Sequence, residues 1–135
     1  MEFSVKTADS RSQIVRLSMS DLKKIEGFNA DLVMLIGCET ADGPLYRGTG
    51  IAGLHQGFLM LGAQNVFGNL WEVDASMAIG LAQKFLDSWA SDHNGAEALR
   101  KSKISTIKEL RRNAYFLKPH PYFWGSSIIL TSLRS

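Results

Sequence analysis

The chain has 135 residues and little of several features that mark common protein classes. Its single cysteine excludes an internal disulfide, and no cysteine and histidine cluster has zinc-site spacing, so we expect no metal. Basic and acidic side chains nearly balance, 15 against 13, so the sequence carries no direct nucleic-acid signal. No apolar run could span a bilayer, and the first residues lack the apolar core of a secretory signal. We expect a cytoplasmic protein with no cofactor and no membrane partner.

Apolar patterning predicts an α/β fold with a mainly parallel sheet flanked by helices. The expected strands cover residues 13–17, 32–36, 65–70 and 123–130. The expected helices cover residues 21–26, 50–61 and 75–89, with a further helix beginning near residue 94. The strand at 32–36 is apolar throughout, which is typical of a fully buried parallel strand. No repeat or linker divides the chain, so we expect residues 1–135 to form a single domain or the C-terminal portion of one.

Several residues have the chemistry of helix ends. Asp74 directly precedes an apolar helical pattern and is predicted to be its N-cap. Asn94 with Glu97 predicts a capping-box start for the next helix. Ser20 and Gly27 are predicted to begin and end the short helix at 21–26.

The one cysteine, Cys38, lies in the tetrapeptide Gly37-Cys38-Glu39-Thr40, directly after the apolar strand. Loops at the carboxyl ends of parallel strands form the ligand crevice of α/β proteins, so a thiol there is well placed to act as a nucleophile. A free cysteine is also often a small buried apolar residue, and position alone leaves both interpretations open.

The segment DLVMLIGCETADGPLYRGTGIAGLHQGFLMLGAQNVFGNLWEVD resembles the CHAT family, caspase-like peptidases related to separase, in which a strand ends in a Cys-Glu-Thr nucleophile motif. Further motifs follow in the family's order: Tyr46-Arg47-Gly48-Thr49-Gly50, Leu61-Gly62-Ala63, Leu70-Trp71-Glu72-Val73-Asp74, Ala96-Glu97-Ala98-Leu99-Arg100 and His120-Pro121-Tyr122-Phe123-Trp124. The resemblance covers roughly residues 14–132. It implies a caspase-like three-layer fold.

The resemblance also implies roles for residues near the thiol. Cys38 corresponds to the nucleophile, and its backbone N–H is expected to be one oxyanion donor. Gly37, Glu39 and Thr40 are expected to support the oxyanion loop.

Two acids that follow the second apolar strand correspond to the region where separase-like relatives bind a basic residue before the scissile bond. Glu72 and Asp74 are therefore the candidate substrate-binding carboxylates. Helix capping is the competing role for Asp74.

The catalytic histidine of caspase-like peptidases lies upstream of the cysteine, and no histidine precedes Cys38 here. Either the base is supplied from sequence upstream of this chain, which leaves the fold incomplete on its N-terminal side, or the chain is a degenerate homologue. His55 is expected to have a packing or surface role, His93 an exposed position at an interhelix turn, and His120 a structural role.

We therefore expect a cysteine endopeptidase that acts on a protein or peptide substrate. The resemblance implies regulation by a helical-repeat region or a partner protein, which would also supply the missing histidine. The main alternative is a catalytically inert caspase-like scaffold or regulatory module. A small-molecule-binding α/β domain with an incidental cysteine is a third possibility. An incomplete sheet would expose an edge, so this chain alone is expected to be unstable or to associate.

Overall fold

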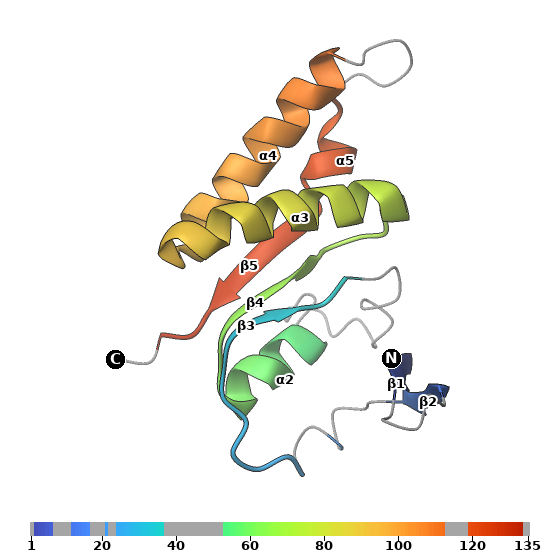
Figure 1. The fold of residues 1–135 in the computed structure, drawn as a ribbon, viewed down its shortest axis with the longest axis vertical. Helices are drawn as coiled ribbons and strands as arrows, with labels where there is room; N and C mark the ends of the chain where they lie inside the picture. Colours follow the sequence, from blue (N-terminus) through green and yellow to red (C-terminus); the bar gives the residue numbers. More distant parts are fainter. Residues whose placement is uncertain are drawn as a thin grey trace.

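The computed structural model describes residues 2–6, 12–16, 21, 24–36, 53–112 and 119–133. The strands β1 (Glu2–Lys6) and β2 (Ser12–Arg16) pair antiparallel as a separate two-stranded sheet. A second sheet, in the order β3-β4-β5, carries the core and is formed by β3 (Ala30–Met34), β4 (Ala63–Asn69) and β5 (Ser127–Thr131). Helices cover both of its faces (Figure 1). The helices are α2 (Gly53–Leu61), α3 (Ala75–Asp92), α4 (Gly95–Arg112) and α5 (Pro121–Trp124).

The α/β fold class with a sheet between helices is confirmed, and β3 pairs parallel to β4, with Met34 opposite Phe67. The pairing of β4 with β5 is antiparallel, with Phe67 opposite Ile129, so the three-stranded sheet is mixed. The connection explains the direction of β5. Two long helices of 18 residues each, α3 and α4, run back and forth between β4 and β5 (Figure 1). The chain therefore returns to the end of the sheet that it left, and β5 must run the opposite way.

One face of the sheet packs against α2. Side chains of a strand alternate between the two faces, and Val33, Leu35 and Val66 form this side of the core. Phe58 of α2 packs on this group and lies 5.8 Å, between ring centroids, from Phe28. Burial of these apolar groups explains why α2 forms where residues 51–61 place apolar side chains at three- and four-residue steps.

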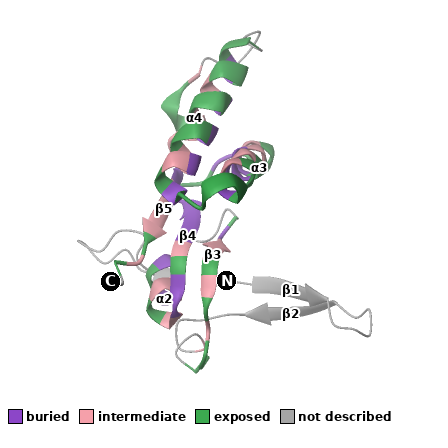
Figure 2. Cartoon of the chain, turned by 60° about the vertical axis from the view of Figure 1, so that its left-hand side comes forward, coloured by how far each residue is buried: buried purple, intermediate pink, exposed green. Residues whose placement is uncertain are grey.

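The other face packs against α3 and α4. Phe67 of β4 lies 4.7 Å, between ring centroids, from Phe85 of α3, and both side chains are completely buried. The helical periodicity of α3 also buries Leu81, Ala82 and Trp89 on this side. Figure 2 shows β4 as the most deeply buried strand of the sheet. The centre of the core is therefore the middle strand and the buried stripe of α3.

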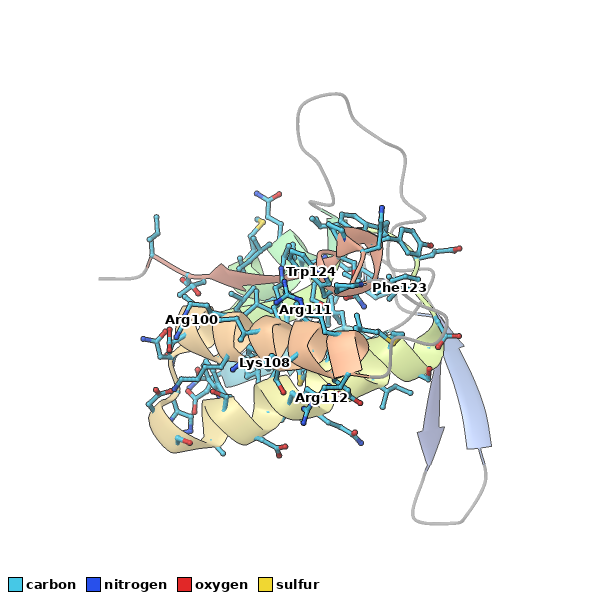
Figure 3. The ribbon with its side chains drawn as sticks, turned by 90° about the horizontal axis from the view of Figure 1, so that it is seen from above. Arg100, Lys108, Arg111, Arg112, Phe123 and Trp124 are labelled. Carbon is cyan, nitrogen blue, oxygen red and sulfur yellow. The ribbon has the colours of Figure 1, made fainter. Side chains whose placement is uncertain are left out.

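The helix α4 contacts α3 through small side chains and presents its basic residues outward. Ala98, Ser102 and Thr106 are buried, whereas Lys108 and Arg111 are exposed. Figure 3 labels four basic side chains along α4, Arg100, Lys108, Arg111 and Arg112. It also labels Phe123 and Trp124 of α5. The exposure of these cations agrees with a solvated helix face.

The residues predicted to cap the starts of α3 and α4 do so in the structure. The carboxylate of Asp74 accepts hydrogen bonds from the backbone N–H of Ser76, at 2.9 Å, and of Met77, at 3.4 Å. Asn94 Oδ1 accepts from the N–H of Glu97 at 3.1 Å, which is one half of the predicted capping box, whereas the N–H of Asn94 donates to Asp92 Oδ1 at 3.1 Å and the Glu97 carboxylate pairs with Arg100. Asp74 thus begins α3, and Asn94 begins α4 at the turn that joins the two helices.

Several predicted elements differ from the structure. The strand β3 is half-buried at Leu32, Val33 and Met34, because it lies at an edge of the described sheet and only β4 covers it. Phe123 and Trp124 belong to α5, where Pro121 at the first helical position and His120 as N-cap favour a helical turn over a strand. The predicted helix at 21–26 lies partly outside the described residues, and residues 25 and 26 are not helical.

Candidate functional site

The carboxyl ends of β3 and β4 lie at the same edge of the sheet because the two strands are parallel. Ile36 follows β3, Asn69 is the last residue of β4, and residues 70–73 follow that strand. Ligand sites of α/β proteins occur at this edge. The predicted site residues Gly37, Cys38, Glu39 and Thr40 continue the chain directly from Ile36, but they lie outside the described residues, as does the glycine-rich segment at 46–50.

A hollow with a volume of about 120 Å³ opens at this edge, on the side of the sheet that α3 covers. Its lining residues come from the ends of β3 and β4 and from the first turns of α3: Ile36, Asn69, Trp71, Val73, Ala75, Ala78 and Ile79. None of these side chains is charged. The hollow is therefore an apolar depression beside the segment that leads to Cys38.

The segment between β4 and α3 contributes alternate side chains to the hollow. Trp71 and Val73 line it, and Ala75 continues the same alternation into α3. Glu72 and Asp74 are not among the lining residues. Both of these predicted substrate-binding acids are solvent-exposed, so they lie on the segment that forms the wall without lining the hollow.

The two acids have different surroundings. The hydroxyl and backbone N–H of Ser76 and the N–H of Met77 hold the pKa of the Asp74 carboxyl below its ordinary value. This carboxylate is already a hydrogen-bonded helix cap. For Glu72, the structure shows a bond to its backbone carbonyl, which accepts from the Tyr122 hydroxyl at 2.7 Å.

Aromatic contacts with α5 fix the wall of the hollow. Trp71 Nε1 donates to the Tyr122 carbonyl at 3.1 Å, and the two rings stack with centroids 6.4 Å apart. The hydroxyl of Tyr122 bonds the next residue of the wall, Glu72. Trp71 is therefore an aromatic side chain of the wall, since it lines the hollow.

Asn69 is the polar side chain of the lining, and only 5% of its surface is exposed. Its Oδ1 accepts a hydrogen bond from Ser127 Oγ at 2.8 Å and lies 3.5 Å from Ser126 Oγ. Within the described residues, its Nδ2 group donates to no acceptor. Asn69 therefore contributes the polar side chain of an otherwise apolar lining, and its Nδ2 group is not among the enclosed groups that lack a partner.

All three histidines of the chain lie among the described residues. His55 belongs to α2, is completely buried and packs directly over Gly68 of β4, which confirms a packing role. His93 is exposed and ends α3 in the left-handed region, with φ of 53°, and its N–H donates to the Trp89 carbonyl. His120 is the N-cap of α5, because its Nδ1 accepts from the N–H of Tyr122 at 3.2 Å. None of the three lines the hollow.

Two further observations concern the described part of the chain only. The described ranges hold no group of three or more histidine, cysteine, aspartate or glutamate side chains placed to bind a metal ion. No helix in these ranges combines the length and the apolar character needed to cross a membrane.

A sequence profile of the CHAT domain matches residues 4–132 of the chain. The chain belongs to the CHAT domain family. This CHAT domain thus has the caspase-like α/β fold that its motifs imply, and the family relates it to cysteine peptidases. No curated protein and no solved structure matches the chain. In the CHAT domain described here, the segment Leu70-Trp71-Glu72-Val73-Asp74 forms one wall of the hollow.

Sequence reasoning did not identify Asn69 or the α3 side chains of the site. Two signals point to them: period-two alternation from residue 69 to 75, and the helical spacing of Ala75, Ala78 and Ile79. Both patterns predict side chains that converge where β4 passes into α3. The sequence pattern does not indicate that 48% of the Ile79 side chain is exposed, and only the structure shows it.

Proposed function

We propose that this CHAT domain is a cysteine endopeptidase whose nucleophile is Cys38. The observation that carries the proposal is the family match over residues 4–132, which includes the Cys-Glu-Thr motif. The position of the apolar hollow supports it, since Ile36 of its lining is two residues from the thiol in sequence. Two peptide units separate Cα atoms by at most about 7.6 Å.

In the proposed reaction, the Cys38 thiolate attacks the carbonyl carbon of a peptide bond and forms a carbon–sulfur bond. The carbon–nitrogen bond breaks, and an imidazolium donates the proton that the leaving amine takes up. Water then hydrolyses the thioester and regenerates the thiol. The N–H of Cys38 is a proposed oxyanion donor, and Gly37, Glu39 and Thr40 are proposed to support the loop. Glu72 and Asp74 stay candidates for binding a basic substrate residue.

The base in this proposal comes from sequence upstream of this chain or from a partner. No histidine precedes Cys38, His55 is enclosed in the core, and His93 and His120 are placed at helix ends. A helical-repeat region or partner protein is the proposed source of regulation. A reducing, cytoplasmic location would keep the single thiol free to react.

The absence of an upstream histidine also supports a second candidate function. An inert caspase-like scaffold or regulatory module needs the fold and its surfaces but no base. It predicts a Cys38 thiol with ordinary reactivity under all conditions.

The alkylation rate of Cys38 by iodoacetamide between pH 5 and pH 9 tests the proposal. Because the chain has one cysteine, all thiol labelling reports Cys38, and Cys38→Ser is the blank. We expect the apparent thiol pKa to fall when the upstream sequence or the partner is added, together with hydrolysis of a protein substrate. An ordinary thiol pKa in both conditions, with no hydrolysis, would instead establish the inert module.

A further inference from the structure

We propose that the hollow binds the substrate side chain that precedes the scissile bond, and that it selects an uncharged aliphatic side chain of about the size of leucine. This inference rests on the proposed peptidase function, because it assigns the substrate class of that same site. It differs from the basic specificity that Glu72 and Asp74 suggest. The tests below separate its failure from a failure of the peptidase proposal.

The location of the hollow supports a role in substrate binding. Its lining joins the end of β3, through Ile36, to the first turns of α3, through Ala78 and Ile79. A peptide whose carbonyl carbon meets the Cys38 sulfur must place the neighbouring side chain within a few ångströms of this segment. The hollow is the depression into which that side chain fits.

The lining chemistry selects against charge. A buried cation or carboxylate needs an opposite charge or several hydrogen bonds, and the lining residues that the structure describes offer neither. The alternation of the wall leaves Glu72 and Asp74 off the lining, and hydrogen bonds to Ser76 and Met77 already occupy the Asp74 carboxylate. An arginine side chain would enter the hollow without a partner for its guanidinium group.

The buried amide of Asn69 supplies the polar contact that such a site needs. Apolar pockets fix the orientation of a ligand through a small number of placed polar groups. Its Oδ1 accepts from Ser127 Oγ at 2.8 Å, whereas Nδ2 has no acceptor among the described residues. A carbonyl of the bound peptide satisfies this donor. The same donor makes an apolar side chain with a free backbone carbonyl a better ligand than an apolar molecule alone.

The size of the hollow fits one medium side chain. Its volume of about 120 Å³ is close to that of an apolar cavity of roughly 150 Å³ that holds benzene. Glycine and alanine would leave most of this space unfilled. A side chain as large as tryptophan would exceed it.

The first test compares two peptidyl acyloxymethyl ketones that differ only in the residue next to the ketone, leucine or arginine. In this reaction the Cys38 sulfur forms a carbon–sulfur bond while the carbon–oxygen bond to the leaving carboxylate breaks. The chain is used together with the upstream sequence or the partner that supplies the base, and each rate is divided by the rate with iodoacetamide to correct for thiol reactivity. We expect the leucine reagent to react about tenfold faster or more, as one well-filled apolar subsite discriminates. Equal rates, or a faster arginine reagent, would overturn the inference while leaving a reactive nucleophile.

A charge placed in the hollow should reverse this preference. Ile79→Glu puts a carboxylate in the lining at a position with 48% exposure, so the fold should tolerate it. We expect the leucine-to-arginine rate ratio to fall about tenfold. Leu86→Glu is the matched control, because Leu86 lies two turns along α3, is 42% exposed and does not line the hollow. A control that changes the ratio as much as Ile79→Glu would refute a local effect.

A second measurement does not depend on the thiol reaction. Methyl NMR of the Cys38→Ser chain with N-acetyl-leucinamide should shift the methyl resonances of Val73 and Ile79, whereas N-acetyl-argininamide should not. If iodoacetamide labels Cys38 but no peptidyl reagent does so in the presence of the upstream sequence or the partner, the peptidase proposal fails, and the NMR measurement alone decides the specificity of the hollow. Absent or equal shifts with the two amides would overturn the inference.

Discussion

The contact between Gly68 of β4 and His55 of α2 gives a sharp prediction for Gly68→Ala. A Cβ at residue 68 would lie 2.7 Å from Cδ2 and 2.8 Å from Cε1 of His55, and closer still to Nε2. Ordinary contacts of this kind are near 3.4 Å or longer, so at least one group must move. His55 has no exposed surface and cannot swing into solvent.

The expected cost follows from overpacking. Forcing one added carbon into a filled site costs about 1–3 kcal/mol, and the rigid backbone of β4 beneath residue 68 favours the upper part of this range. Truncating the buried ring with His55→Ala should itself cost about 2–4 kcal/mol, by analogy with other large-to-small core changes. In the double variant the new methyl group enters the space left by the ring. The two costs should therefore fail to add, with a favourable coupling of about 1–3 kcal/mol.

Urea unfolding followed by circular dichroism measures these free energies for the wild type, the single variants and the double variant. Gly80→Ala is the matched control, since a Cβ at residue 80 of α3 meets no atom within 4 Å. The same change there should stabilise by about 1 kcal/mol, because glycine is a poor helix former. Additive losses in the double variant, or a cost below about 0.5 kcal/mol for Gly68→Ala, would refute the packing of His55 against residue 68.

Three further predictions concern the helices. Asp74→Ala should lower the melting temperature at neutral pH, and the difference in melting temperature between the variant and the wild type should vanish in acid. The pKa of Asp74 is lowered in the folded state, so the stabilisation by its carboxylate is present above the ordinary carboxyl pKa and is lost as the pH falls through the folded pKa. Phe85→Ala should lower the free energy of unfolding in urea by about 3–5 kcal/mol, whereas Leu86→Ala, at the half-exposed neighbouring residue, should lower it by less than about 1 kcal/mol. Similar losses in the two variants would contradict the burial of Phe85 against the sheet. Lys84→Met should raise the pKa of Glu109 in an NMR titration, because Lys84 Nζ donates to the Glu109 carboxylate, and an unchanged pKa would exclude this ion pair in solution. The free energy of unfolding should change by less than about 1 kcal/mol, because the pair is solvated.

Local patterns predicted the helices and their caps because those signals are contained in short segments. Asp74 and Asn94 cap the helices that follow them, and the apolar stripe of α3 faces the sheet. The direction of β5 could not be predicted in the same way, because it depends on the back-and-forth course of α3 and α4. The predicted strand at 123–130 is wrong at Phe123 and Trp124, because aromatic residues favour strands, whereas the His120 cap and Pro121 favour a helical turn.

The candidate site was only partly predictable. Parallel strands place the ends of β3 and β4 together, and this followed from their apolar patterns. The hollow itself arises where Ile36, which follows β3, meets Asn69 of β4 and Ile79 of α3, more than 30 residues farther along the chain. The alternation from residue 69 to 75 places Asn69 on the same side as Trp71 and Val73, but its burial and its hydrogen bond to Ser127 depend on the fold. The predicted roles of Cys38 and its neighbours stay predictions.

The register of β4 also constrains where a catalytic base can lie. Gly68 and Asn69 are consecutive, so they face opposite sides of the sheet, and His55 over Gly68 is separated by the sheet from the hollow under α3. Moving His55 to the other side would require a slip that turns every side chain of β4 to the wrong face. His93 ends an 18-residue helix whose first turn borders the hollow, a separation of about 27 Å along the helix axis. His120 caps α5 with its Nδ1. We therefore expect the proposed peptidase to take its base from sequence upstream of this chain or from a partner, and thiol reactivity with and without either of them separates an assembled peptidase from an inert module.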